Sequence, residues 1–230
     1  MKKWLMAVLL MLSLAACIRD GKYEVQGDVV VYSYWTFSFG PRSDTLPDAD
    51  AATFRSVTNW LAHDSSRVYF KSNLVPGADA TALHAVRYPL FHDGRDYYYH
   101  EEPLHVTDVE SFKVIKWMED DFWAKDSRYA YYNSQRMDDV DLSTFKVVDW
   151  SWARDKNHVY YYGELIQDAD PATFEVMGHS IYCRDKSHIW CGNTLMADVD
   201  MVTFKVDDID RAHDKNGRYW FEKRDTVEVE

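Results

Sequence analysis

The chain has 230 residues, of which 26 are Lys or Arg and 38 are Asp or Glu, so its formal net charge is −12 at pH 7. This negative charge argues against nucleic acid as a partner and would repel anionic lipid headgroups. Hydrophobic residues make up 47% of the chain and aromatic residues 16%, enough to build a substantial core.

The N-terminal segment predicts export. Lys2 and Lys3 precede an apolar run that ends in Leu-Ala-Ala-Cys17, and this order is typical of a secretory signal peptide in residues 1–16. The run is too short to span a bilayer. The cysteine in this context resembles a bacterial lipobox, which implies cleavage before Cys17 and its acylation. Ile18, in place of an aspartate, indicates by the usual sorting pattern the outer membrane, with the body facing the periplasm. A free cysteine beside an ordinary signal peptide is the alternative.

Residues 17–27 are expected to form a lipidated tether, and residues 28–230 a single repeat domain. Removal of residues 1–16 would leave 24 basic and 38 acidic residues, a net charge of −14. Membrane contact is therefore expected through the acyl chains and not through a basic surface. No Pro-, Gly- or Ser-rich linker interrupts the later sequence, which favours one domain.

From Asp50 onward the sequence is an internal repeat. A first aspartate is followed five residues later by an aromatic residue, ten residues after that by a second aspartate, and four residues after that by Phe. The clearest copy has Asp155, Tyr160, Asp170 and Phe174 at these positions. The first aspartates of successive copies are 29, 33, 29, 30 and 29 residues apart, and they are Asp64, Asp93, Asp126, Asp155, Asp185 and Asp214.

Each copy predicts a β-hairpin, because segments such as VYYY are rich in aromatic and β-branched residues. The first aspartate suits the tip of a three-residue loop that is closed by a left-handed residue such as His158. The second aspartate suits the N-cap of a single helical turn, with Phe174 packed into the core. The fold class is therefore mainly β, with tandem β-hairpin repeats of about 29–30 residues, each with one short helical turn, stacked as an elongated repeat domain.

The long interval contains four extra residues, in the segment KWMEDDFWA between Phe112 and Asp126. In a repeat protein such an insertion often maps to a loop on one face, sometimes the binding face. Neutral drift is the alternative. The residues of this candidate interaction loop are Trp117, Glu119, Asp120 and Asp121.

Cys183 and Cys191 flank one hairpin, and export would place them in a compartment that permits disulfides. With a three-residue loop of Lys186, Ser187 and His188, the two cysteines face each other across the hairpin, and we expect a disulfide. A loop of two or four residues would offset them, and two packed thiols are the alternative.

The segments DKNHVYYY and RDKSHIW, the variants VYF, YYYH and YAYY, and the following DADPATF and DVDMVTF resemble the DKNYY family of bacterial repeat proteins. The resemblance extends over nearly all of the chain from about Asp50. Copies vary, since a lysine follows the first aspartate only at Lys156, Lys186 and Lys215. The resemblance implies the repeat fold and an envelope location, and it adds no catalytic residue.

No pattern of catalytic or metal-binding chemistry stands out. Paired aspartates such as Asp168 and Asp170 have the oxygen ligands that Ca²⁺ prefers, but the EF-hand loop with its glycine and glutamate is absent, and turn formation already explains these residues. We therefore expect no catalytic residue, no metal and no cofactor.

Three functions remain. The first is a non-enzymatic envelope lipoprotein that is held to the membrane through Cys17 and binds an unidentified envelope protein through its repeat surface. The second is a glycan or peptidoglycan binder, which the 36 aromatic residues suggest and which exposed, coplanar Tyr or Trp side chains would favour. The third is a hydrolase with an unrecognised acidic pair, for which a deep pocket with a carboxyl group of raised pKa is expected.

Overall fold

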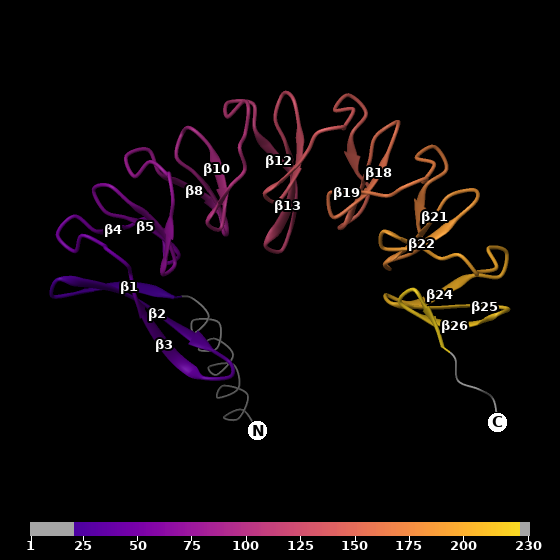
Figure 1. Cartoon of the computed structure of the whole chain (residues 1–230), viewed down its shortest axis with the longest axis horizontal. Helices are drawn as coiled ribbons and strands as arrows, with labels where there is room; N and C mark the ends of the chain where they lie inside the picture. Colours follow the sequence, from indigo (N-terminus) through magenta and orange to yellow (C-terminus); the bar gives the residue numbers. More distant parts are fainter. Residues whose placement is uncertain (1–20, 226–230) are drawn as a thin grey trace, which may run out of the picture. The chain divides into compact units, whose positions relative to one another are not determined.

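The computed structural model describes residues 21–225, and the chain divides into two compact units, Met1–Val109 (unit 1) and Glu110–Glu230 (unit 2). Within the described range every regular element is a β-strand (Figure 1). The mainly β class with tandem hairpin repeats is confirmed. The proposed signal peptide and Cys17 lie outside the described residues.

Unit 1 contains one three-stranded sheet followed by two four-stranded sheets. The three-stranded sheet consists of β1 (Lys22–Gln26), β2 (Val29–Thr36) and β3 (Gly40–Thr45). The second sheet consists of β4 (Arg55–Ser56), β5 (Leu61–His63), β6 (Val68–Phe70) and β7 (Asn73–Val75), and the third of β8 (His84–Arg87), β9 (Leu90–His92), β10 (Tyr97–Tyr99) and β11 (Glu102–Pro103).

Unit 2 contains four four-stranded sheets, one for each repeat. The first two consist of β12 (Lys113–Met118), β13 (Asp121–Lys125), β14 (Ala130–Tyr132) and β15 (Gln135–Met137), and of β16 (Lys146–Val147), β17 (Trp152–Arg154), β18 (Val159–Tyr161) and β19 (Glu164–Leu165). The last two consist of β20 (Glu175–Val176), β21 (Tyr182–Arg184), β22 (Ile189–Cys191) and β23 (Thr194–Leu195), and of β24 (Lys205–Asp208), β25 (Arg211–Asp214), β26 (Gly217–Trp220) and β27 (Lys223–Arg224).

Each four-stranded sheet is an antiparallel meander whose central hairpin carries the first aspartate. Arg154 pairs with Val159, so the loop between β17 and β18 has four residues, Asp155 to His158. The predicted three-residue loop is therefore wrong. The expected left-handed fourth residue is also absent from the described non-glycine copies, because the aspartate side chain itself closes the loop, as shown below.

The predicted helical turn is also wrong. After Asp170 the chain makes an isolated turn in which the Thr173 N–H donates to the Asp170 carbonyl oxygen (3.2 Å), and β20 begins directly after Phe174. A helix needs several successive turns to offset the cost of its first one, and the three residues between Asp170 and Phe174 leave no room for them. The second aspartate does bond to the start of this turn, because its carboxylate accepts the Ala172 N–H (3.0 Å).

The core lies between successive sheets, which are stacked face to face within each unit (Figure 1). Side chains alternate between the two faces of a strand, so one strand contributes to two cores. In β17, Ala153 packs in the cluster shared with Trp123, whereas Trp152 packs in the cluster shared with Cys183. Because both faces are covered, central strands such as β6, β14 and β22 are uninterrupted triplets of buried apolar residues instead of the alternating pattern of a half-exposed sheet.

The tether predicted for residues 17–27 is too long. Residues 22–26 form β1, and the Tyr23 ring packs against Tyr32 and Phe54 with centroids 4.9 and 5.5 Å away. These contacts make β1 part of the folded unit, so the segment between Cys17 and the first strand is only four residues long, residues 18–21.

Candidate functional site

The first aspartate of each repeat is buried and acts as a hydrogen-bond acceptor for two segments. In the first copy Asp64 is fully buried, and its Oδ1 accepts the backbone N–H groups of Ser66 (2.8 Å) and Arg67 (2.7 Å) within its own loop. Its Oδ2 accepts the N–H of Asp50 (3.1 Å), the second aspartate of the preceding copy, and the hydroxyl of Tyr69 (3.2 Å). One carboxylate thus joins a loop, a turn and a core tyrosine.

The same arrangement recurs along the chain. The hydroxyl of the aromatic residue donates to the first aspartate in the pairs Tyr98–Asp93, Tyr131–Asp126, Tyr160–Asp155 and Tyr219–Asp214, at 2.8 to 3.1 Å. The backbone N–H of the second aspartate donates in the pairs Asp79–Asp93, Asp141–Asp155, Asp170–Asp185 and Asp200–Asp214, at 2.5 to 2.9 Å. The spacing of the sequence repeat therefore reflects a repeated network, with the aspartate at its centre.

The electrostatics of this network favour the ionised carboxylate. Burial raises the pKa of Asp64, but the N–H groups of Ser66, Asp50 and Arg67 and the Tyr69 hydroxyl lower it more, and the net shift is downward. The net shift is also downward for Asp93, Asp185 and Asp214. Burial, followed by the neighbouring carboxylate, raises the pKa of Tyr69 to about 12. A carboxylate held in its charged form by structural donors is a poor general acid.

The lysine after the first aspartate and the threonine before the phenylalanine have defined partners. Lys156 Nζ lies 2.6 Å from Asp141 Oδ2, and the Lys156 N–H donates to Thr144 Oγ1 (3.0 Å). The equivalent ion pair of Lys215 and Asp200 (2.6 Å) lowers the pKa of Asp200 to about 2, mainly through the hydrogen bond from the lysine. These motif residues join the hairpin tip to the preceding turn, so their role is structural.

The candidate interaction loop is the end of an extended hairpin. Met118 pairs with Asp121, so the insertion lengthens β12 and β13 and leaves Glu119 and Asp120 at the turn. Asp121 accepts hydrogen bonds from the Tyr132 hydroxyl (3.1 Å) and the Asn133 side chain (2.8 Å), and Trp117 packs on Phe122 with ring centroids 5.1 Å apart. Trp117 and Asp121 therefore stabilise the hairpin, and Glu119 and Asp120 form its exposed turn.

The expected disulfide between Cys183 and Cys191 is not formed. Cys183 pairs with Trp190, and Cys191 pairs with Tyr182, because the loop has four residues. Paired residues share a face and neighbours alternate, so the two thiols point to opposite faces of the sheet. Both cysteines are buried as free thiols, in the clusters of Trp152 and of Phe204 respectively.

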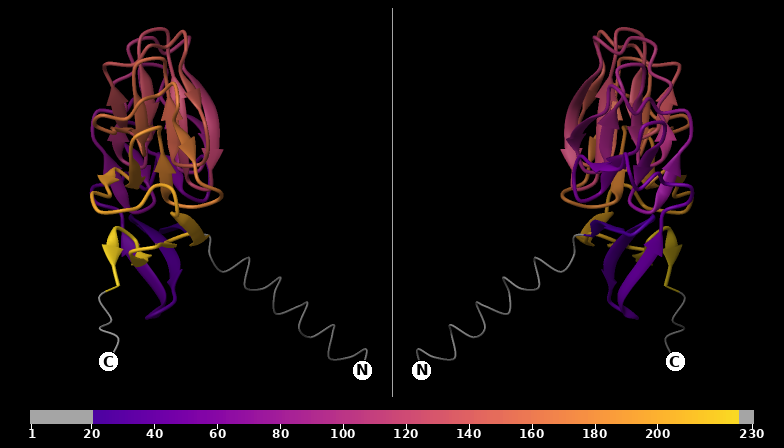
Figure 2. Two further views of the ribbon diagram at one scale, coloured as in Figure 1. Left: turned by 90° about the vertical axis from the view of Figure 1, so that its right-hand side faces the viewer. Right: turned by 90° about the vertical axis from the view of Figure 1, so that its left-hand side faces the viewer.

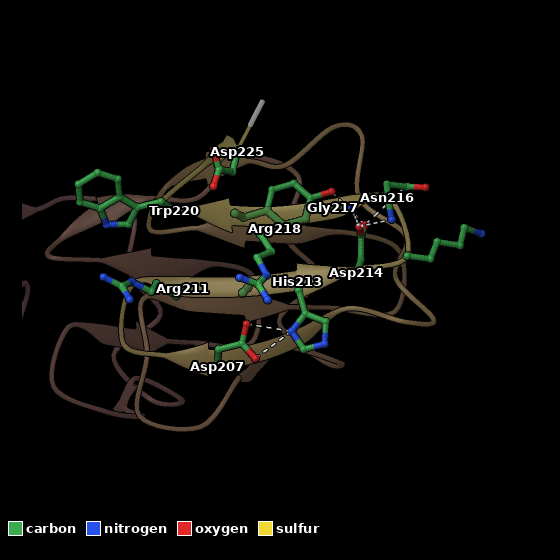
Figure 3. Close-up of a pocket in the computed structure, with 12 residues that line it drawn as sticks. Asp207, Arg211, His213, Asp214, Asn216, Gly217, Arg218, Trp220 and Asp225 are labelled. Atoms are coloured by element: carbon green, nitrogen blue, oxygen red, sulfur yellow. Dashed lines mark hydrogen bonds and ion pairs between the residues drawn. The ribbon is translucent and has the colours of Figure 1, made fainter. Parts of the chain in front are cut away.

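The last sheet has a hollow of about 860 Å³ on its outer face (Figure 3). Arg211 pairs with Trp220 and His213 with Arg218 across β25 and β26, and His213 Nδ1 lies 2.8 Å from both carboxylate oxygens of Asp207. The positions of Arg211 and Arg218 correspond to buried Trp152 and Val159 two repeats earlier. Polar residues at core positions are typical of the capping repeat of a stack, and we assign this face that role.

Within residues 21–225 no group of three or more potential metal ligands is close enough to hold an ion. Nor does the described part of the chain contain a helix long and apolar enough to cross a membrane. The first aspartates of two such pairs, Asp48 and Asp168, lie instead in turns, where their backbones are left-handed with φ values of 54° and 61°.

A repeated β-bulge in the first strand of the sheets escaped the sequence analysis. The register of β12 shifts between Val114 and Lys116, and that of β8 shifts between Ala85 and Arg87. The same position in other sheets shows two successive N–H groups that donate to one carbonyl oxygen, as Val148 and Asp149 do to Trp152 (2.8 and 3.3 Å). The bulge residues are 40 to 48% exposed, and we call them the bulge row: Val57, Val86, Ile115 and Val148.

One signal could have identified this row, since an aliphatic residue stands three positions after Phe54, Leu83, Phe112 and Phe145. Bulges re-aim side chains and lie preferentially at sheet edges. In the four sheets of the bulge row they turn one aliphatic side chain toward solvent beside the edge strand, whereas the bulge of the last sheet carries Asp207. Within each unit, the bulge row therefore provides a series of apolar contacts at the repeat spacing.

A family model described as the DKNYY family matches residues 20–102, 103–164 and 152–230. No curated protein and no solved structure matches the chain. The three matches together extend over almost the whole sequence and agree with the repeats seen in the structure. The chain belongs to the DKNYY family.

Proposed function

We propose that the protein is a non-enzymatic lipoprotein of the cell envelope whose repeats bind another protein. The observation that carries the binding role is the bulge row, in which the same backbone irregularity exposes an aliphatic side chain in successive sheets. Stacked repeats present such positions at regular spacing, about 10 Å for sheets packed face to face. An extended partner that contacts several repeats would bury these side chains together.

The fate of the acidic residues supports a binding role over hydrolysis. The first aspartates are buried hydrogen-bond acceptors with lowered pKa values at Asp64, Asp93, Asp185 and Asp214, and the second aspartates bind turns and lysines. Acid catalysis requires a carboxyl group whose pKa is raised toward the working pH. The lowered pKa values of these first aspartates are thus the opposite of what a general acid needs.

The positions of the aromatic residues give little support to a glycan-binding function. The largest fully buried side chains include Trp123, Trp152, Trp190, Tyr69, Tyr131 and Tyr182. Exposed aromatic residues such as Trp150 and Trp220 come from different sheets and positions of the repeat. Sugar recognition by stacking needs an accessible aromatic face, which the core residues lack.

The proposed localisation to the cell envelope rests on the N-terminal sequence. Lipid attachment is tested by growth with labelled palmitate, with Cys17→Ser as the control. We expect label on the native chain and none on the variant. A chain that carries no label and is recovered in the soluble fraction would contradict this localisation.

The binding role is tested by a photo-crosslinking residue at position 148 in the intact chain in its native envelope. The matched control position is Leu165, which is 41% exposed and lies in β19, at the opposite edge of the same sheet. We expect one discrete protein adduct from position 148. The adduct should be lost in the Ile115→Asp variant, which changes the bulge row, and it should be retained in the Leu195→Asp variant, which changes an exposed residue of β23 outside the row. Adducts from position 165 alone, or co-sedimentation with cell-wall sacculi without an adduct, would reject the bulge row as the site.

A further inference from the structure

The tip of the β2–β3 hairpin is the most exposed apolar feature of unit 1. Phe37 is 86%, Phe39 71% and Trp35 48% exposed, and we call these residues the aromatic tip. Thr36 pairs with Gly40 and closes a three-residue loop, in which Thr36 Oγ1 accepts the Phe39 N–H (3.2 Å). The loop is therefore held in a defined conformation that presents its aromatic side chains.

The aromatic tip lies beyond the rest of its sheet. β1 pairs with β2 only as far as Ser33, so the chain from Tyr34 to Pro41 extends past the end of β1 as a two-stranded ribbon. Figure 2 shows this indigo ribbon projecting from the four-stranded sheets of unit 1. A position of this kind suits contact with a surface outside the domain better than packing within it.

The ribbon also differs in charge from the remainder of the chain. Residues 29–43 contain no Asp or Glu and one Arg, in a protein with 38 acidic residues. That residue, Arg42, lies over the Phe39 ring at 4.9 Å from its centroid. The chain from Tyr34 to Pro41 thus carries no acidic side chain, and the nearest one, Asp44, pairs with Tyr32 below the ribbon. Arg42 favours contact with anionic headgroups. Trp and other aromatic side chains partition to the interface of a bilayer.

The register places the beginning of the described chain on the same side as the aromatic tip. Lys22 pairs with Ser33, and β1 is antiparallel to β2, so the chain that precedes Lys22 leaves the sheet in the direction of the tip. Cys17 lies five residues before Lys22, a reach of at most roughly 18 Å. Phe37 lies four residues beyond Ser33, or about 13 Å along an extended strand. A membrane that holds Cys17 is therefore within reach of the tip.

We infer that the aromatic tip of Trp35, Phe37 and Phe39 inserts into the interface of the bilayer that anchors Cys17. This inference rests on the lipid attachment proposed above. With the acyl chains and the tip as two separate contacts, unit 1 is held in a fixed orientation to the membrane. The lipid anchor alone would provide only one of these contacts.

The test uses the lipidated full chain in vesicles of phosphatidylethanolamine and phosphatidylglycerol, with an environment-sensitive fluorophore attached at Ser38→Cys. Cys17 is acylated in this protein and Cys183 and Cys191 are buried, so the label is specific. The matched control is Val202→Cys in unit 2, which is 93% exposed. We expect spin-labelled lipid to quench the fluorophore at position 38 at least threefold more than at position 202. We also expect the difference to disappear when Trp35, Phe37 and Phe39 are replaced by Ser.

The outcomes separate the two proposals. Palmitate on Cys17 with equal lipid quenching at both positions would overturn the membrane contact and leave the anchor in place. Shielding of position 38 from aqueous iodide without lipid quenching would indicate that a protein covers the tip, and would also overturn the inference. Absence of palmitate would overturn the anchor and the inference together. Because the fluorophore reports from an otherwise native tip, misfolding of the serine variant does not affect the main comparison.

Discussion

At the scale of single residues, the first aspartate of each repeat is the centre of the fold. Its two carboxylate oxygens accept different hydrogen bonds. Oδ1 accepts those that close the local loop, and Oδ2 accepts those from the preceding turn and from the tyrosine hydroxyl. The copy at Asp185 allows a comparison within the chain, because Trp190 replaces the tyrosine there. Asp185 keeps its three N–H donors, and His188 Nδ1 lies 3.5 Å from its Oδ1. The backbone donors are therefore common to both kinds of copy, whereas the hydroxyl is replaceable.

This difference predicts unequal effects of two substitutions in one copy. Asp93→Ala leaves the N–H groups of Asp79, Arg95 and Asp96 without their acceptor and should lower the free energy of unfolding by about 3–5 kcal/mol. Tyr98→Phe removes only the hydroxyl (3.0 Å) and should cost about 1–2 kcal/mol. Urea denaturation of both variants measures the effects, and equal losses would contradict the division of roles.

The cysteines give a second prediction at this scale. Burial, followed by Cys191 and Asp185, raises the pKa of Cys183 well above its usual range, and burial raises the pKa of Cys191 to about 12. A thiol reacts as its thiolate, so neither should react with a thiol reagent in the folded protein at pH 8. Both should react after denaturation without reductant. If denaturation exposes no thiol until a reductant is added, the two cysteines form a disulfide and the four-residue loop is incorrect.

At the scale of elements, the second hairpin of each repeat depends on a tight two-residue turn. In the turn between β18 and β19, Tyr162 and Gly163 have φ values of 49° and 82°, the left-handed pair that twists a hairpin correctly. A Cβ atom on Gly163 would also lie 2.8 Å from Cβ of Tyr132 in the neighbouring sheet. Gly163 is therefore required both by its own turn and by the close approach of the next repeat.

Two glycine substitutions separate these requirements. Gly178→Ala places a side chain at φ 68° with nothing within 4 Å, so it should cost only the backbone term of about 1 kcal/mol. Gly163→Ala adds the clash with Tyr132 and should cost about 1–3 kcal/mol more. Thermal or urea unfolding measures the difference. Equal stability of the two variants would show that the sheets separate easily at this turn.

The elements also show what the sequence could reveal. The period, the hairpins and the Asp loops follow from local turn chemistry, which a sequence contains. The four-residue loop depends on Asp155 Oδ1, which accepts the N–H groups of Asn157 and His158. The conformation of the preceding turn depends on Asp155 Oδ2, which binds the N–H of Asp141, a contact between segments 14 residues apart that no local pattern specifies. The bulge at Val148 likewise arises where β16 leaves its pairing with β17. Specific hydrogen-bond acceptors determine these details, and residue propensities do not.

At the scale of the whole molecule, each unit is a series of thin sheets that lack an independent core. A four-stranded sheet with strands of two to six residues buries enough surface only when both neighbours cover it. The aspartate network therefore acts on more than one sheet at a time, because it fixes the turn that leads from one sheet to the next. The hydrophobic contacts supply the attraction between sheets, and the carboxylates supply their spacing.

The stability of the whole molecule should consequently fall in acid. The pKa values of Asp64, Asp93, Asp185 and Asp214 are lowered in the folded state, whereas the pKa of an aspartate in the unfolded chain is about 3.9. As the pH falls from about 5, the unfolded chain takes up protons first, so it is stabilised relative to the folded chain. The contribution of these groups is complete above the unfolded pKa and is lost as the pH passes below the folded values. Urea midpoints between pH 7 and pH 2.5 should decline steeply below pH 5, and less steeply in Asp93→Asn, which has one titrating group fewer. A midpoint that stays constant to pH 3 would show that the buried carboxylates do not stabilise the stack in their ionised form.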